Sequence, residues 1–194
     1  MYTIKEQQID KNANIKQNRF VDIIRFGGLI FHTNDLAKIW KINNRHTLII
    51  TLKRYIDNGL LYRLYRGLYS LKPITDLDPL LVGAAAINNY SYLSCETVLV
   101  KYGVIFQDLN YFTFVSEQSK RLTIAPYNYY YRQLKKDFLY NDFGVNKNNI
   151  LNEASLERAV ADILYFNPDY YFDNPAPINW QRVHEIQKNV YQII

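Results

Sequence analysis

The alternation of apolar and polar residues in the first part of the chain predicts three helices. Apolar residues recur at helical spacing over 18–26, 33–40 and 45–58, so each stretch can turn one apolar side inward. Thr33 and Asn44 stand where the second and third helices need N-caps, because their side-chain oxygens can accept a bond from a free backbone N–H. The inward side of the third helix is predicted to hold Leu48, Ile49, Leu52, Tyr55 and Ile56.

After the third helix the spacing changes to that of short strands. Gly59 follows the helix at a position that favours a left-handed residue. Two apolar runs, 60–64 and 68–71, flank a turn over 65–67 that contains a glycine, which is typical of a β-hairpin. The apolar run 29–31 is a candidate third strand beside this hairpin.

Helix, turn, helix and hairpin in this order indicate a winged helix-turn-helix. We predict this domain over residues 1–74, with 1–17 as a tail or an additional helix. The stretch 73–78 contains a proline and is predicted to join it to a second domain over 75–194.

The second domain is predicted to be helices packed on a small antiparallel sheet, which makes the fold class α+β. The helices are predicted over 79–88, 95–102, 156–166 and 180–193. Their N-caps are predicted at Asp78, Ser94, Ser155 and Asn179. Strands are predicted at 111–115, 121–125 and 127–134, with further candidates at 137–144 and 148–151.

The outward side of the third helix and the turn before it carry residue types that contact DNA. The second helix of a helix-turn-helix enters the major groove, and its N-terminal half meets base edges. Asn44, His46 and Thr47 are predicted to read bases, and the basic residues to contact phosphates and the groove. The predicted DNA-binding residues are Lys41, Asn43, Asn44, Arg45, His46, Thr47, Ile50, Lys53 and Arg54, with Tyr65 and Arg66 at the hairpin turn.

The distribution of charge separates the two predicted domains. Residues 1–74 carry 13 Lys and Arg against 5 Asp and Glu, a balance of +8, whereas 75–194 carry 10 against 13, a balance of −3. A phosphate-binding surface requires such a concentration of positive charge. The mildly acidic second domain is expected to do something else, such as bind a protein. Helix-turn-helix folds also serve as protein-interaction modules, which leaves a non-DNA interpretation open.

The sequence offers little for an enzyme. It contains no phosphate-binding loop, no G-x-G-x-x-G and no H-E-x-x-H motif, so we expect no catalysis, no cofactor and no bound metal. Two weaker alternatives are a Cys95 nucleophile with His184 as its base, and a metal-dependent nuclease site. The nuclease alternative would use Asp137 and Asp142 beside Lys135 and Lys136.

The single cysteine and the hydropathy of the chain indicate where in the cell the protein is expected. Cys95 is the only cysteine, which excludes an intramolecular disulfide. No signal peptide is evident, and no apolar run approaches the roughly 18 residues of a membrane span. We therefore expect a cytoplasmic protein without a membrane partner.

Two segments of the second domain resemble the AbiEi-type antitoxins of type IV toxin–antitoxin systems. The segment 92–105 is similar to the family's Tyr-[Ile/Leu]-Ser segment and the helix that ends in Tyr-Gly-[Leu/Ile]. The segment 153–164 looks like its Ala-Ser-Pro-Glu-Lys-Ala-Leu-Leu-Asp helix, with Leu156 in place of Pro and Arg158 in place of Lys. The hairpin residues Arg66-Gly67-Leu68-Tyr69 also match the family's N-terminal half, so the resemblance covers roughly 18–168.

The resemblance implies a transcriptional autoregulator with a role in phage defence. Its winged helix would bind inverted repeats in the promoter of its own operon and repress it. Its C-terminal domain would counter a co-encoded nucleotidyltransferase-like toxin, and direct contact with that toxin is not implied. The alternative is a non-enzymatic interaction module whose acidic C-terminal domain binds a basic protein.

Overall fold

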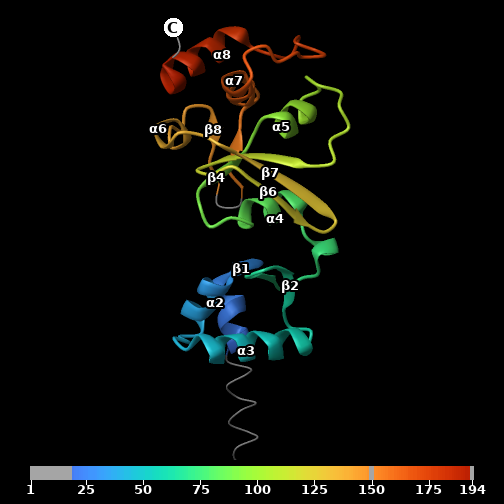
Figure 1. The fold of residues 1–194 in the computed structure, drawn as a ribbon, viewed down its shortest axis with the longest axis vertical. Coiled ribbons are helices and arrows are strands. Elements are labelled where there is room, and N and C mark those ends of the chain that lie inside the picture. The colour runs from blue at the N-terminus through green and yellow to red at the C-terminus, as the bar shows by residue number, and fades with distance from the viewer. Residues whose placement is uncertain (1–18, 149–150, 193–194) are drawn as a thin grey trace, which may run out of the picture. The chain divides into compact units, whose positions relative to one another are not determined.

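Helices and strands are interspersed along the chain in the computed structural model, which describes residues 19–148 and 151–192 (Figure 1). The mixed composition confirms the α+β class. The chain divides into two units, one ending at Leu77 and the other beginning at Asp78. A short 3-10 helix, Ile74–Asp76, precedes this boundary, which falls slightly after the predicted one at 74.

The first unit consists, in its described part, of three helices and a three-stranded sheet. Residues 19–26 are helical, and the two further helices are α2 (Thr33–Ile39) and α3 (Arg45–Asp57). The strands are β1 (Ile30–His32), β2 (Tyr62–Tyr65) and β3 (Leu68–Ser70). They pair in the antiparallel order β1-β3-β2. The predicted helices, the hairpin and the strand before α2 are therefore confirmed, while the predicted tail lies outside the described residues.

The core of the first unit is closed by one side of α3. Leu48, Leu52 and Tyr55 are buried there, and the Tyr55 ring lies 5.0 Å from that of Trp40. The prediction was wrong for Ile49, which is 53% exposed. At 100° per residue Ile49 lies too far around the helix, and Thr51, three positions after Leu48, is buried in its place.

The helix ends of the first unit show how local signals compete with tertiary bonds. Asn44 caps α3 as predicted, because its Oδ1 accepts a bond of 3.0 Å from the Thr47 N–H. Gly59 has the left-handed φ of +68° that was expected after α3. Thr33 was the wrong N-cap for α2, since His32 occupies that position. The Thr33 hydroxyl instead donates to the Gly67 carbonyl, 3.3 Å away.

The second unit is built on a six-stranded sheet in the order β6-β7-β5-β4-β9-β8. These strands are β4 (Ser91–Leu93), β5 (Phe112–Ser116), β6 (Lys120–Ile124), β7 (Tyr127–Gln133), β8 (Val145–Asn146) and β9 (Glu153–Ala154). The predicted antiparallel pairing holds for β4 with β5, β6 with β7 and β8 with β9. It was wrong for the sheet as a whole, because β5 pairs with β7 and β4 with β9 in parallel. These pairings join segments that are not adjacent in the chain, so no hairpin signal marks them.

Helices cover both faces of this sheet (Figure 1). On one face lies α4 (Pro79–Ala85), where a Cβ added to Gly83 would come within 2.6 Å of ring carbons of Phe114 and Tyr129. On the other face lie α5 (Glu96–Lys101) and α7 (Leu156–Phe166), and α8 (Trp180–Ile186) packs on α7. The sheet is therefore the middle layer of the unit.

Several helix predictions for this unit hold. Asp78, Ser155 and Asn179 cap α4, α7 and α8 by accepting backbone N–H bonds of 2.8, 3.2 and 3.1 Å. The last helix continues as a π-helical turn, Gln187–Tyr191, and the end of the predicted helix lies outside the described residues.

Two predictions for this unit were wrong. Ser94 does not cap α5, since Cys95 is at the N-cap and the Ser94 hydroxyl donates to Asp162. The strand candidate over 137–144 contains a helix instead, α6 (Lys136–Leu139). Of the candidate over 148–151, residues 149–150 lie outside the described part, and Leu151 is in no strand.

Among the described residues, no helix combines the length and the apolar character that crossing a membrane requires.

Candidate nucleic-acid interface

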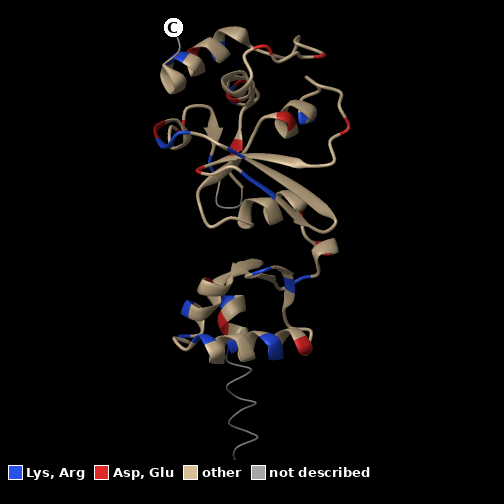
Figure 2. Cartoon of the chain, in the orientation of Figure 1, with Lys and Arg blue, Asp and Glu red and all other residues tan. Residues whose placement is uncertain are grey.

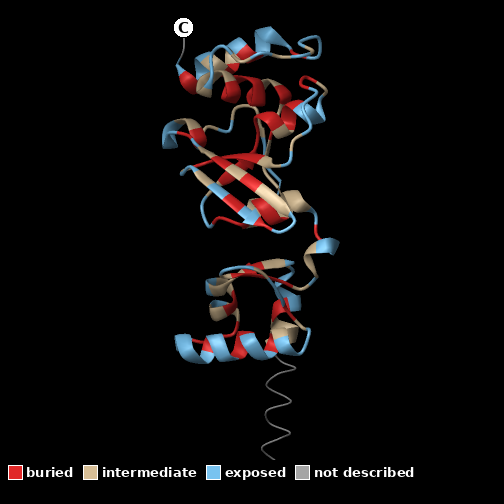
Figure 3. Ribbon diagram, turned by 45° about the vertical axis from the view of Figure 1, so that its right-hand side comes forward, coloured by how far each residue is buried: buried red, intermediate tan, exposed pale blue. Residues whose placement is uncertain are grey.

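The predicted DNA-contacting residues of α3 and its preceding turn form one exposed surface. Figure 3 shows α3 with one side buried and the opposite side exposed. Figure 2 shows that basic residues predominate along this helix. All nine residues predicted here are exposed: Lys41, Asn43, Asn44, Arg45, His46, Thr47, Ile50, Lys53 and Arg54.

A buried residue that sequence reasoning missed anchors the turn before α3. Ile42 lies in the break between α2 and α3, residues 41–44, whose other three residues are polar. It is 8% exposed, and its N–H donates to the Ala37 carbonyl at 2.9 Å. Lys41 adopts a left-handed φ of +54° beside it. With Ile42 packed in the core, its neighbours Lys41 and Asn43 point to solvent. The signal that could have found this anchor is the single apolar residue in the break.

Carboxylates of the described residues do not neutralise the cations of this surface. No carboxylate among the described residues lies within ion-pair distance of Lys41, Arg45, Lys53 or Arg54, because the ion pairs found all lie in the second unit. Exposed cations that are free of carboxylates can neutralise phosphates and release counterions. The surface is therefore electrostatically suited to an anionic polymer.

The hairpin turn lies apart from this surface. Tyr65 and Arg66 are exposed, but the Gly67 carbonyl accepts bonds from the N–H (2.9 Å) and the hydroxyl of Thr33. These bonds hold the turn at the start of α2. Figure 1 shows α3 along one edge of the unit and strands β1 and β2 along the opposite edge. The structure thus gathers the predicted residues into two groups.

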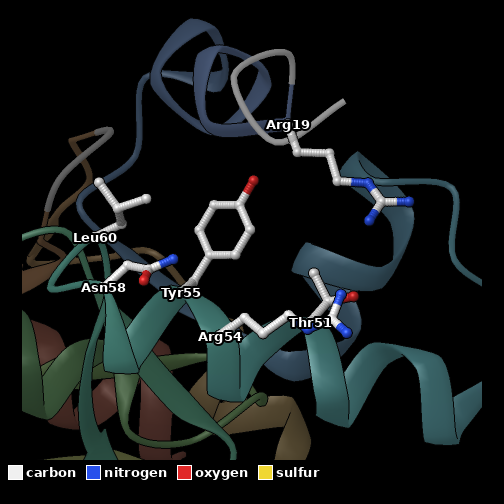
Figure 4. A pocket seen from close by; sticks show the side chains of 6 residues that line it. All are labelled: Arg19, Thr51, Arg54, Tyr55, Asn58 and Leu60. Carbon is white, nitrogen blue, oxygen red and sulfur yellow. The ribbon is translucent and has the colours of Figure 1, made fainter. Parts of the chain in front are cut away.

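A small pocket brings a further arginine to the C-terminal half of α3 (Figure 4). Its volume is about 40 Å³, and Arg19, Arg54 and Tyr55 line it with Thr51, Asn58 and Leu60. Burial raises the pKa of Tyr55, and the nearby Arg19 lowers it by less. Arg19 comes from the first described helix, so no local pattern linked it to α3.

The alternative catalytic residues do not converge. Cys95 is fully buried, and burial and then the Asp162 charge raise the pKa of its thiol well above the ordinary value. His184 is exposed on α8. Asp142 is engaged in an ion pair of 2.5 Å with Lys147, and Asp137 lies in the first turn of α6. In the described part of the chain, no group of three His, Cys, Asp or Glu residues could hold a metal ion.

A buried polar network occupies the centre of the second unit. Arg158 and Asp162, one helical turn apart on α7, are both 0% exposed, and their side chains bond at 2.8 Å (Nε to Oδ1). The Arg158 guanidinium also donates to the Tyr92 hydroxyl and to the backbone carbonyls of residues 138, 141 and 143, at 2.8–3.1 Å. All five of its N–H donors are therefore used.

Asp162 completes this network from the other side. Its Oδ2 accepts a bond of 2.6 Å from the Ser94 hydroxyl, and its Oδ1 accepts from the Tyr191 hydroxyl. Burial lowers the pKa of Arg158, but the Asp162 charge and the nearby tyrosines raise it by more, so the guanidinium stays charged. The i,i+4 spacing of Arg and Asp in an apolar helix was the available sequence signal.

This network explains why the two resembling segments stand out. Tyr92 and Ser94 come from the segment 92–105, and Arg158 and Asp162 come from the segment 153–164. These four residues, of which Arg158 stands where the AbiEi pattern has Lys, are thus brought into contact inside the second unit, where solvent does not reach them. Their position indicates a role in holding the fold.

No protein-family model matches this chain, and no curated protein matches it.

Proposed function

We propose that this protein is a DNA-binding transcriptional repressor, with the first unit acting as a winged helix-turn-helix and α3 as its recognition helix. One observation carries the proposal: α3 buries one side in the core and presents on the other a row of cations that have no carboxylate partner in the described part of the chain. A helix fixed in this way can enter the major groove with its side chains in defined positions.

The N-terminal half of α3 is the part expected to read bases. Asn44 uses one lone pair of its Oδ1 to cap the helix, which fixes the side chain and leaves its amide nitrogen free to donate to DNA. Arg45, His46 and Thr47 follow on the exposed side. Arg45 is the residue best suited to a guanine, because its guanidinium can donate two parallel bonds to one base edge. Lys53 and Arg54, further along, would contact phosphates.

A titration with the DNA upstream of the chain's own gene tests this proposal. The full chain is titrated against that duplex and against a scrambled duplex at two salt concentrations. Specific binding with a steep fall at higher salt is expected. Arg45→Ala should reduce the preference for the upstream duplex, and Lys188→Ala, at an exposed cation of the second unit, should change nothing. Equal weak binding to both duplexes would refute a sequence-specific repressor.

The antitoxin function is proposed from the resemblance in the second unit. We infer that this non-enzymatic unit opposes a co-encoded nucleotidyltransferase-like toxin. The buried network supports this inference in one respect: it joins residues of the two segments that resemble the family, 92–105 and 153–164, by hydrogen bonds. Co-expression of the neighbouring gene tests it: the full chain should restore growth, and a chain whose second unit is destabilised by Arg158→Met should restore it less.

A second candidate function is that of a protein-interaction module. Ile49 and Ile50 on α3 are 53% and 38% exposed, and adjacent exposed apolar residues are more typical of a protein contact than of a phosphate contact. Under this alternative, the chain forms a stable complex with a protein partner and does not shift promoter DNA. Ile49→Lys would then disrupt the complex, whereas it would leave a DNA complex intact or strengthen it.

A further inference from the structure

The second unit contains a groove over β6 and β7, whose rim is formed by the end of α7. The groove has a volume of about 680 Å³, and Lys120, Arg121, Tyr130, Arg132, Gln133 and Phe166 are among its lining residues. Tyr129 and Tyr131 on β7 donate their hydroxyls to carbonyls of α4. Because side chains alternate along a strand, Tyr130 and Arg132 point to the opposite face. We call this feature the β6–β7 groove.

The β6–β7 groove is positively charged although its unit carries a net negative charge. Figure 2 shows basic residues on this pair of strands. Lys120 and Arg121 have no ion-pair partner among the described residues. Arg132 is paired with the buried Glu96. Lys120 pairs in register with Tyr131, so its side chain lies on the other face of the sheet, and Arg121 is the cation of the groove face without a carboxylate partner among the described residues.

Aromatic rings hold both arginines of the groove. The Arg121 guanidinium carbon lies 4.8 Å from the centre of the Tyr130 ring, whose register partner on β6 is Arg121 itself. The Tyr111 ring stacks on Tyr130 at 4.3 Å with an interplanar angle of 13°. The Arg132 guanidinium carbon lies 5.5 Å from the centre of the Phe166 ring. Guanidinium groups supported in this way lose little freedom when they bind an anion.

We propose that the β6–β7 groove binds the phosphate groups of a nucleotide unit, supplied either by a free nucleotide or by single-stranded RNA. Arginine supplies paired donors for phosphate oxygens, and its planar group also stacks on a base. A basic groove with aromatic side chains on a sheet face is the arrangement by which single strands are bound. The volume lies in the range of small-ligand sites. An acidic peptide would use the cations but not the aromatic and guanidinium planes.

Fluorescence anisotropy with the full chain and labelled oligouridylate at low ionic strength tests the proposal. Arg121→Glu should weaken binding by about tenfold or more, because it reverses a phosphate-contacting charge at an exposed position. Lys188→Glu makes the same change in charge at an exposed position that does not line the groove, and should alter binding by less than about twofold. Arg54→Glu, on α3, controls for RNA binding by the first unit.

Two results would overturn the proposal. One is the absence of binding to both oligouridylate and uridine triphosphate by the unmodified chain. The other is a loss of binding in Arg54→Glu with none in Arg121→Glu. Arg121→Gln removes the charge without reversing it and should give a smaller loss in the same direction, so a folding defect in one variant does not decide the result.

Competition identifies the source of the phosphate. If uridine triphosphate displaces the labelled strand as well as unlabelled oligouridylate does at equal nucleotide concentration, the groove binds single nucleotides. If only the oligonucleotide displaces it, the groove binds a strand. If polyglutamate displaces the strand equally well, the groove is a nonspecific cation surface and the proposal is overturned.

Discussion

The exposed cations of α3 and the buried Arg158 of α7 use the same chemistry for different ends. On α3, Arg45, Lys53 and Arg54 are exposed and have no carboxylate partner among the described residues. In α7, Arg158 is 0% exposed and every one of its N–H donors is bonded within the unit. A cation that is exposed to solvent can still bind a partner. A cation whose donors are all bonded within the protein stabilises the fold and cannot bind a partner.

This difference also shows that the net charge of a unit does not indicate what its charged residues can bind. The second unit carries more acidic than basic residues, yet its basic residues are distributed unequally between a buried network, surface ion pairs and the β6–β7 groove. What a charged residue can bind depends on whether it is already paired. The following four predictions test this contrast, beginning with the largest expected effect.

Arg158→Met should lower the free energy of unfolding of the second unit by about 3–5 kcal/mol, because it leaves the buried Asp162 without its cation. Urea denaturation followed by Trp180 fluorescence, in a Trp40→Phe background that silences the first unit, measures the loss. The double variant Arg158→Met/Asp162→Leu removes both charges and should recover part of it. A single variant as stable as its parent would show that the network does not stabilise the unit.

Arg54→Ala should cost roughly 1–3 kcal/mol of operator affinity if Arg54 contacts a base edge. If it contacts only a phosphate, binding to all duplexes should fall alike, and the dependence of affinity on salt should become less steep. The same titration as above separates these outcomes. Unchanged affinity for every duplex would place Arg54 outside the interface and leave Arg45 as the arginine of α3 to test next.

Asn44→Ala should lower the free energy of unfolding of the first unit by about 1 kcal/mol, because the Thr47 N–H loses its acceptor. Trp40 fluorescence in a Trp180→Phe background reports on this unit. Asn179→Ala removes the equivalent cap from α8 and serves as the matched control, which should leave the first transition in place. Equal shifts in both variants would contradict the assignment of the effect to α3.

Arg182→Ala should change the free energy of unfolding of the second unit by less than about 1 kcal/mol, since its ion pair with Glu185 is 45% and 44% exposed. Denaturation in high salt should reduce even this small effect. A loss comparable to that of Arg158→Met would show that burial does not distinguish the two arginines.

Helix caps were predictable from the sequence where the capping side chain bonds an N–H close to it in the chain. Asn44, Ser155 and Asn179 cap their helices as expected, because the N–H they serve is three residues away. Thr33 and Ser94 failed as caps, since a carbonyl at the hairpin and a carboxylate on α7 offered them other partners. The parallel pairing of β5 with β7 has no neighbouring-residue signal.

The candidate site was likewise predictable only where its residues lie on one helix. The exposed side of α3 follows from helical periodicity, so its cations could be named from the sequence. Arg19, which shares a pocket with Arg54, comes from another helix, and the β6–β7 groove depends on a strand register that the sequence does not reveal. Residues that meet only through tertiary structure were the ones missed.

The reach of the buried network has a consequence for synthesis of the chain. Ser94 and Asp162 are 68 positions apart, and Tyr191 joins them from 29 positions further on. This unit can close only after residue 191 has emerged from the ribosome. The first unit is complete at Leu77, so it can fold while translation is still under way. Nascent chains stalled before residue 191 should therefore carry a folded first unit and an unfinished second one.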